Sequence, residues 1–126
     1  MQIRQGVDIV SVERLEEAAR RHGERFLNRI FTTEERAYCE SKRYKYEHYA
    51  ARFAAKEAMM KAMEIRRKNR LCFREIEVRR RPTGKPEITI GPESRSRFGL
   101  PEKIQIELSM AHERTYAVSF VVLLLP

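Results

Sequence analysis

The segment between Tyr44 and Met63 limits the possible folds more than any other part of the sequence. Small and apolar residues recur in it at spacings of three and four, which is the period of one face of an α-helix. The residues of this face are Ala51, Ala54, Ala55, Ala58, Met59 and Ala62. We therefore expect one long helix over residues 44–63. Because 126 residues are enough for one compact domain, we expect a single domain over residues 1–126.

The second half of the chain has the alternating pattern of β-strands. Apolar and polar residues alternate over residues 76–78 and 104–110, and the turn signal Pro-Thr-Gly occupies residues 82–84. A hairpin through residues 113–115 should lead into the last strand. That strand, over residues 115–125, is apolar on both faces, so we expect both faces to be covered, in part by another subunit.

The first half begins with a strand and continues with helices. Residues 2–10 alternate apolar and polar side chains, which indicates a short strand. Residues 12–29 follow a helical pattern that Gly23 breaks or bends, and Thr32 or Thr33 can cap the next helix. Helices early in the chain and an antiparallel sheet late in it indicate an α+β fold.

The chain is strongly basic, with 26 lysines and arginines against 18 aspartates and glutamates and a formal net charge of +8. Such a surface attracts anions, including nucleic acids, acidic proteins and phosphorylated ligands. No apolar run approaches the length that a bilayer-spanning helix needs, and the first residues lack the features of a secretory signal. The two cysteines, Cys39 and Cys72, form no pair that would bind zinc. We therefore expect a cytoplasmic protein without membrane contact.

Two carboxylates are candidates for chemistry, and the first, Asp8, lies inside the first strand, where aspartate is uncommon. The second, Glu57, lies on the long helix on the same face as Phe53 and Lys61. The spacing of Glu57 and Lys61 also suits an ordinary ion pair on a helix surface. If the helix packs over the strand, Asp8 and Glu57 converge, and a cation between them would relieve their repulsion. Carboxylates suit Mg²⁺, which completes its shell with water and substrate phosphate, and Lys61 would meet the phosphate charge.

The predicted helix over residues 12–29 has a one-sided distribution of charge. At 100° per residue, four arginines fall in one narrow stripe beside Phe26, and glutamates fall to the other side. The stripe consists of Arg14, Arg21, Arg25 and Arg29. It is either a solvated charged face or a docking surface for an acidic partner. A single histidine near the predicted hairpin, His112, is either a turn or packing residue or a donor to an oxyanion.

Together these residues resemble the holo-acyl-carrier-protein synthase family of 4′-phosphopantetheinyl transferases. The resemblance runs in order through GVDIVSVERL, RIFTTEE, RFAAKEAMMKA, RPTGKPEI and LSMAHERTYAVSFVV, and so covers nearly the whole chain. The family pattern is Gly-x-Asp with an arginine six residues after the aspartate, followed later by Phe-x-x-Lys-Glu-Ala-x-x-Lys. In this sequence those positions are Gly6, Asp8, Arg14, Phe53, Lys56, Glu57, Ala58 and Lys61. The resemblance implies the family's fold, with an antiparallel sheet against a long helix.

The resemblance also implies a reaction, the transfer of the 4′-phosphopantetheine arm of coenzyme A to a serine of an acidic apo acyl carrier protein, with release of 3′,5′-ADP. Asp8 and Glu57 would hold Mg²⁺ against the coenzyme A pyrophosphate. Glu57, directly or through a bound water, would be the base for the serine, and Lys61 would neutralise or protonate the leaving phosphate. The family is associated with fatty-acid biosynthesis, within lipid metabolism, but the sequence does not decide between a carrier of fatty-acid synthesis and one of specialised-metabolite synthesis.

By the same resemblance, two further sets of residues bind the substrates. Coenzyme A would contact Arg52, Phe53, Lys56, Lys61, Gly84, Lys85, Pro86, Ser109 and His112. The carrier protein would dock on Arg14, Arg21, Arg25, Phe26 and Arg29. The family is typically trimeric with sites between neighbouring subunits, which suits a last strand that is apolar on both faces.

The chain departs from the family pattern at two points near the expected coenzyme site. Relatives commonly have a glycine-rich turn after the long helix, whereas this chain has the glycine-free sequence MEIRRKNRLCF. The basic side chains that could meet phosphates there are Arg66, Arg67, Lys68 and Arg70. Ala111 stands where relatives usually carry a hydroxyl before the histidine, so one hydrogen bond to the ligand is missing. Neither departure changes Asp8, Glu57 or Lys61.

Two other functions are compatible with parts of the sequence. A small nucleic-acid-binding protein could use RRKNR and RRR as phosphate contacts, but this explains neither Asp8 nor the ordered pair of motifs, and the chain lacks an aromatic-rich strand for base stacking. A carrier-binding relative without activity would keep the fold and the docking surface alone. We favour the active transferase and expect no nucleic-acid partner.

Overall fold

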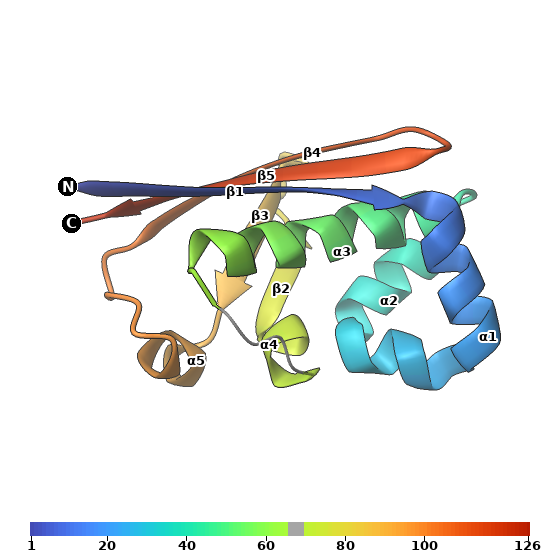
Figure 1. Ribbon diagram of the computed structural model, residues 1–126, viewed down its shortest axis with the longest axis horizontal. Helices are drawn as coiled ribbons and strands as arrows, with labels where there is room; N and C mark the ends of the chain where they lie inside the picture. The colour runs from blue at the N-terminus through green and yellow to red at the C-terminus, as the bar shows by residue number, and fades with distance from the viewer. Residues whose placement is uncertain (66–69) are drawn as a thin grey trace.

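Helix α3 (Lys45–Ala62) lies lengthwise against one face of a three-stranded antiparallel sheet in the computed structural model, which describes residues 1–65 and 70–126 (Figure 1). The strands of this sheet, in spatial order, are β1 (Gln2–Ser11), β5 (Tyr116–Leu125) and β4 (Gln105–His112). Strands β2 (Ile76–Arg80) and β3 (Pro86–Ile90) form a separate antiparallel hairpin. The other helices are α1 (Val12–Ile30), α2 (Thr33–Glu40), α4 (Arg70–Glu75) and α5 (Pro92–Arg97). The predicted α+β fold is confirmed, with the first strand paired to the last.

The close packing of α3 on β1 depends on small residues at the contact. Every residue of the predicted apolar face is at most 1% exposed. A Cβ added at Gly6 would lie 2.0 Å from the carbonyl oxygen of Ala58, so only glycine fits there. The backbones of β1 and α3 therefore lie in direct contact, which brings side chains on the helix-facing side of the strand beside those of the helix.

Helix α1 follows β1 directly and is bent in its second half. Ser11 caps its start by accepting a hydrogen bond from the backbone N–H of Arg14. Gly23 has φ 67° and ψ −155°, which interrupts the helix and confirms the predicted break. The next helix, α2, is capped by Thr32 in a capping box with Glu35, which decides between the two threonines that the sequence allowed.

Helix α3 contributes to two apolar clusters at its two ends. Its first half packs with α1 and α2, and its second half packs with the β2–β3 hairpin and the three-stranded sheet. In Figure 1, α1 and α2 accordingly lie at one end of α3, α4 lies below it, and the hairpin crosses it in this view. No helix in the described part of the chain is both long enough and apolar enough to cross a bilayer.

The face of the sheet that points away from α3 carries a continuous set of exposed apolar side chains. The large exposed ones are Ile3, Val7, Ile9, Tyr116, Val118 and Phe120. The register pairs Val7 with Phe120 and Ile9 with Val118, so these residues of β1 and β5 lie side by side. The sequence predicted that both faces of the last strand would be covered; α3 covers one of them, and coverage of the other by a second subunit stays a prediction.

Candidate functional site

Asp8 and Glu57 line one pocket at the junction of β1, α1 and α3. Asp8 shares the helix-facing side of β1 with Gly6, and Glu57 projects from the fourth turn of α3. The pocket has a volume of about 380 Å³. Its lining consists of Asp8, Ile9, Val10, Ser11, Arg14, Leu15, Ala18, Phe26, Phe53 and Glu57. The structure thus brings the two predicted carboxylates together, and it places Phe53 and Arg14 in the same wall.

Lys61 bonds to the strand across from its helix. Its Nζ donates to Oδ1 of Asp8 and to the carbonyl oxygen of Val7, each at 3.0 Å. The ammonium is half exposed, whereas the Asp8 side chain is 18% exposed. This ion pair of Lys61 therefore links α3 to β1, and it places a positive charge beside Asp8 at the edge of the carboxylate pocket.

The donor set of this pocket suits a magnesium ion better than a zinc ion. No group of three or more His, Cys, Asp or Glu side chains with the spacing of a metal site occurs among residues 1–65 and 70–126. Two carboxylates in one pocket are the ligand number with which proteins usually hold Mg²⁺, because the ion keeps water or substrate phosphate in its remaining positions. Asp8 and Glu57 thus fit the predicted metal.

Arg52 lies on the opposite side of α3 and is buried. It is 1% exposed, and its guanidinium carbon lies 4.0 Å from the ring centroid of Tyr38. Arg80 stacks on the same ring at 4.9 Å. Within the described residues, Nε and Nη1 of Arg52 make no hydrogen bond. A buried cation with unsatisfied donors is costly unless an anion meets it, so this position is consistent with the predicted role in ligand binding.

Lys56, a predicted coenzyme A contact, lies in the protein interior. Its Nζ lies 2.8 Å from Oε1 of Glu35 and donates to the carbonyl oxygens of Phe73 at 2.7 Å and Ile76 at 2.6 Å. The side chain is fully buried, and burial lowers the pKa of Lys56 although Glu35 opposes the shift. An ammonium has three N–H donors, and all three are engaged inside the protein. The structure thus gives Lys56 a set of interior partners, and its predicted contact with coenzyme A stays a prediction.

His112 is part of a small cluster at the start of α3 that sequence reasoning did not find. Its Nδ1 lies 2.9 Å from Oε1 of Glu47, and its ring packs edge-on against His48 at 4.8 Å. Burial, followed by the nearby charges of His112 and Arg52, lowers the pKa of His48 to about 4. His48 lies one helical turn before Arg52, and this i, i+4 spacing is the signal that could have identified it.

The remaining predicted coenzyme residues lie at the other edge of the sheet from Asp8. Gly84 and Lys85 lie in the turn before β3, and Pro86 is the first residue of that strand; Lys85 pairs with Glu107 of β4 at 3.3 Å. Ser109 lies on β4 and is exposed on the open face of the sheet. Strand β5 separates β4 from β1, so the two edges are about 10 Å apart. One chain therefore does not bring all the predicted coenzyme residues into one pocket.

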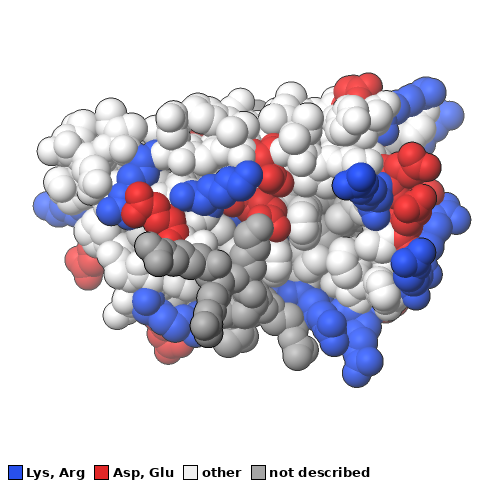
Figure 2. All heavy atoms as spheres, viewed as in Figure 1, with Lys and Arg blue, Asp and Glu red and all other residues white. Residues whose placement is uncertain are grey.

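The predicted docking stripe is exposed but not straight. Arg14, Arg21, Arg25 and Arg29 are all exposed. The stripe was predicted for one regular helix, whereas the bend at Gly23 divides it into two parts. Phe26 is half-buried and lines the Asp8–Glu57 pocket, so the stripe borders that pocket. Figure 2 shows basic side chains around acidic ones at the α1 end of the molecule.

One part of the expected coenzyme site cannot be placed. Arg66, Arg67 and Lys68 lie outside the described residues, and so does the side chain of Arg70. Their predicted contact with phosphates stays a prediction.

Comparison with known proteins places this geometry in a family. Residues 4–121 match the 4′-phosphopantetheinyl transferase superfamily. The chain is 43% identical over 118 residues to the holo-[acyl-carrier-protein] synthase of Thermodesulfovibrio yellowstonii, covering 94% of this chain and 95% of that protein. It is 41% identical over 119 residues to the synthase of Koribacter versatilis, covering 94% of each.

Solved structures agree with the sequence comparison. The Helicobacter pylori holo-[acyl-carrier-protein] synthase in complex with coenzyme A matches with a TM-score of 0.79 and 30% identity, over 94% of this chain and 98% of that one. The Chronobacterium ammoniagenes synthase–coenzyme A complex matches with a TM-score of 0.84 and 28% identity, over 100% of this chain and 99% of that one. This chain therefore belongs to the holo-[acyl-carrier-protein] synthase family of phosphopantetheinyl transferase enzymes.

Proposed function

We propose that this protein transfers the 4′-phosphopantetheine arm of coenzyme A to a serine of an acidic apo acyl carrier protein, in the presence of Mg²⁺, and releases 3′,5′-ADP. The observation that carries the proposal is the single pocket lined by Asp8 and Glu57, with Lys61 bonded to Asp8 at its edge. The coenzyme A complexes of related synthases support the choice of donor substrate. We place the reaction in the cytoplasm, as a step of fatty-acid biosynthesis.

Asp8 and Glu57 are the proposed metal ligands. Mg²⁺ held by their carboxylates would neutralise charge on the pyrophosphate of coenzyme A and make its β-phosphorus a better electrophile. The proposed role of the two side chains is to fix the ion on the wall of the pocket. Their position between β1 and α3, whose backbones touch, provides a rigid support for that role.

Glu57 and Lys61 are the proposed proton and charge carriers. The serine oxygen of the carrier attacks the β-phosphorus, and its proton passes to Glu57 directly or through one water. The bond between that phosphorus and the bridging oxygen breaks, and 3′,5′-ADP leaves with the bond electrons. Lys61 then neutralises or protonates the leaving phosphate. To do so, its ammonium would turn from Asp8, its partner at the edge of the pocket, toward the phosphate.

Coenzyme A is proposed to bind between two subunits. The carboxylate pocket with Phe53 would come from one subunit, and Arg52, the 84–86 turn, Ser109 and His112 from its neighbour. The separation of these two groups within one chain supports this arrangement, and so do the free N–H groups of the buried Arg52. The exposed apolar face of the sheet is the proposed subunit contact, in a homotrimer.

The acidic carrier protein is proposed to dock on the arginine stripe of α1. Arg14 lines the carboxylate pocket and is exposed, and Phe26 reaches into the same lining. A carrier held by these side chains would therefore present its serine at the mouth of the pocket. Positive charge on the stripe and negative charge on the carrier would also speed their encounter.

Intact-mass spectrometry tests the proposal. An apo acyl carrier protein incubated with this protein, coenzyme A and Mg²⁺ should gain the mass of one phosphopantetheine arm. The gain should disappear with EDTA and with a carrier whose acceptor serine is replaced by alanine. An unmodified carrier in the complete mixture, tested with several acidic carriers, would refute the activity.

A further inference from the structure

The ammonium of Lys61 lies on the carboxylate of Asp8, one of the two proposed metal ligands. Its Nζ is 3.0 Å from Oδ1 of Asp8 and 3.0 Å from the carbonyl oxygen of Val7. Two of the three N–H groups of the ammonium are therefore used on neighbouring residues of β1. Any other cation that binds Asp8 has to compete with this contact.

The strand holds Asp8 in place more firmly than the helix holds the ammonium of Lys61. Asp8 pairs across the sheet with Ser119, whose hydroxyl donates to the carbonyl oxygen of Ala51 in α3 at 2.9 Å. Gly6, on the same side of β1, lies directly against the backbone of α3. The Lys61 side chain, on a flexible four-carbon stem, is 51% exposed, against 18% for Asp8. When the contact breaks, we therefore expect the lysine to move.

A divalent ion and the ammonium repel each other strongly if both bind Asp8. Mg²⁺ binds carboxylate oxygens at about 2.0–2.1 Å, and the ammonium lies 3.0 Å from the same carboxylate. The two cations would then be on the order of 5 Å apart. At that separation the repulsion between a double and a single positive charge lowers affinity by about tenfold even in water. The contact of Lys61 with Asp8 therefore weakens the binding of a divalent ion.

A diphosphate is the kind of anion that would draw the ammonium away from Asp8. It carries more negative charge than one carboxylate, and its oxygens accept charge-assisted hydrogen bonds. Lys61 lies in the last turn of α3, one turn beyond Glu57, so a diphosphate at the Asp8–Glu57 pocket is within reach of its side chain. The movement would leave both oxygens of Asp8 to accept a metal. Metal and diphosphate would then each raise the affinity of the protein for the other.

We propose that Lys61 shields Asp8 from divalent ions until a diphosphate draws its ammonium away. This inference rests on the proposed function, in which Asp8 holds the metal against the pyrophosphate of coenzyme A. It adds that the protein alone binds Mg²⁺ weakly and takes it up together with the coenzyme. Lys61 thereby sets the order in which the metal and the coenzyme bind, besides its proposed role at the leaving phosphate.

Electron paramagnetic resonance of Mn²⁺, which accepts the same oxygen ligands as Mg²⁺, tests the shielding without coenzyme A or carrier. Lys61→Met should bind Mn²⁺ about tenfold more tightly than the original protein, because the ammonium is gone. Lys61→Gln, which keeps an N–H donor but loses the charge, should show a similar gain. In an Asp8→Asn background, Lys61→Met should bring no gain, because the carboxylate that the lysine shields is absent.

The same signal measures the effect of the diphosphate. Saturating coenzyme A should raise the Mn²⁺ affinity of the original protein by a larger factor than that of Lys61→Met. The original protein gains both a phosphate ligand and the release of Asp8, whereas the variant gains only the ligand. Equal factors in the two proteins would show that the coenzyme does not move the ammonium, and would overturn the proposed order of binding.

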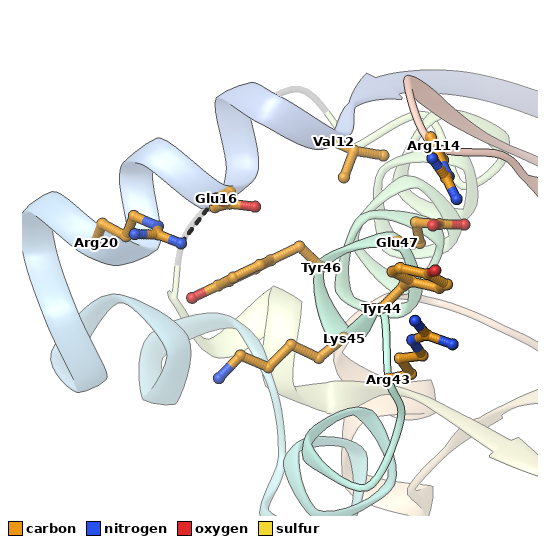
Figure 3. Close-up of a pocket in the computed structure, with 9 residues that line it drawn as sticks. All are labelled: Val12, Glu16, Arg20, Arg43, Tyr44, Lys45, Tyr46, Glu47 and Arg114. Atoms are coloured by element: carbon orange, nitrogen blue, oxygen red, sulfur yellow. Dashed lines mark ion pairs between the residues drawn. The ribbon is translucent and has the colours of Figure 1, made fainter.

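Lys45→Met is the matched control for the loss of charge. Lys45 pairs with Glu40 at 3.1 Å, so the change removes one positive charge and breaks an ion pair of similar length at the start of α3. Figure 3 shows Lys45 in the lining of a pocket at that end of the helix. This lining shares no described residue with the Asp8–Glu57 pocket. Lys45→Met should therefore bind Mn²⁺ like the original protein.

Three results would overturn the shielding by Lys61. They are an unchanged Mn²⁺ affinity in Lys61→Met, an equal gain in Lys45→Met, and a gain that persists in the Asp8→Asn background. All three would leave the proposed transfer standing, because the EDTA-sensitive mass gain of the carrier tests it separately. An unmodified carrier would refute the transfer whatever the affinity for Mn²⁺.

Discussion

Lys56 and Glu57 are neighbours in the sequence, and both are buried, but they face two different sides of α3. On the side of α2 and β2, the ammonium of Lys56 is enclosed by Glu35 and two backbone carbonyl oxygens. On the side of β1 and α1, Glu57 lines an open pocket together with Asp8. The same Lys-Glu motif therefore supplies one residue to the interior and one to a surface cavity.

The difference lies in how each side satisfies its charges. The carboxylate of Glu35 also accepts the backbone N–H groups of Thr32 at 2.8 Å and Val78 at 2.7 Å. A buried polar network of this kind is stable only when every member is paired, and it then has no group left for a ligand. On the other side, Asp8 and Glu57 line a pocket that a ligand can enter. Under the proposed function, this difference in access gives the two neighbouring residues different roles.

The largest effect is expected from Glu57→Gln, which removes a charge from the open pocket. The glutamine keeps the shape of the side chain but is a weaker metal ligand and cannot take the serine proton. We expect kcat/KM for carrier modification to fall by about 10³-fold, with the unfolding free energy nearly unchanged. Intact-mass kinetics and urea denaturation measure the two quantities.

An exposed glutamate of α1 provides the matched control for this change. Glu17→Gln removes the same charge from the protein outside the Asp8–Glu57 pocket, and it should leave transfer unchanged. Full activity of Glu57→Gln would contradict the assignment of Glu57 as metal ligand or base. The two sides of α3 would then differ in burial but not in function.

On the side of α3 that faces α2 and β2, which we call the closed side, Lys56→Met should lower the stability of the protein rather than its activity. The variant leaves the Glu35 carboxylate in the interior without its cation, and breaking a buried pair in this way typically costs about 3 kcal/mol of unfolding free energy. Under conditions in which the variant is folded, its KM for coenzyme A should equal that of the original protein. Urea denaturation checks the first expectation and steady-state kinetics the second. A stable variant with a strongly raised KM would restore Lys56 as a coenzyme ligand.

The sequence predicted the site better on the open side than on the closed side. The strand position of Asp8 and the helical spacing of Phe53, Glu57 and Lys61 depend only on local periodicity, and the α3–β1 contact brings Asp8, Phe53 and Glu57 together in one pocket. Local periodicity could not show that Lys56 faces the interior, because its partners, Glu35 and the carbonyls of Phe73 and Ile76, come from segments far away in the sequence. The bend at Gly23 was predictable, but its effect on the arginine stripe depends on a backbone angle that no pattern gives.

Arg52 combines features of both sides, since it is as buried as Lys56 but has N–H groups without a protein acceptor in the described chain. Arg52→Met should therefore leave the unfolding free energy within about 1 kcal/mol of the original, the size of the lost stacking on Tyr38. KM for coenzyme A should rise about thirtyfold, because charge-assisted hydrogen bonds to the ligand are lost. Denaturation and kinetics that instead matched those of Lys56→Met would show that Arg52 belongs to the closed network.

Reversal of charge on the arginine stripe should affect only the carrier protein. Arg14 and Arg25 lie on opposite sides of the bend at Gly23, and Arg14→Glu/Arg25→Glu should raise KM for an acidic carrier about tenfold. KM for coenzyme A should hold constant, and the defect should shrink at high salt. Arg20→Gln, on another face of α1, is the control and should behave like the original protein. Equal effects on both substrates would argue against docking at this stripe.

The smallest effect concerns His48, which lies between the closed network and His112. Its pKa is lowered from 6.5 to about 4, first by burial and then by the charges of His112, Arg52, Lys42 and Arg80. The unfolded chain therefore binds a proton at this residue between about pH 6.5 and pH 4, whereas the folded protein does not. Stability should fall as the pH decreases through that window. Glu40 and Glu77 also have lowered pKa values, but these reduce stability mainly below their ordinary pKa of 4.5. A comparison of stability between pH 7 and pH 5 therefore reports mainly on His48.

His48→Phe tests this pH dependence, because phenylalanine keeps a ring against Tyr38 and His112 but has no nitrogen to titrate. Urea denaturation should show that the original protein loses more unfolding free energy between pH 7 and pH 5 than the variant does. The ring signals of His48 in an NMR titration should shift only near pH 4. Equal losses in the two proteins would mean that water reaches His48, and that the closed side of α3 ends before this residue.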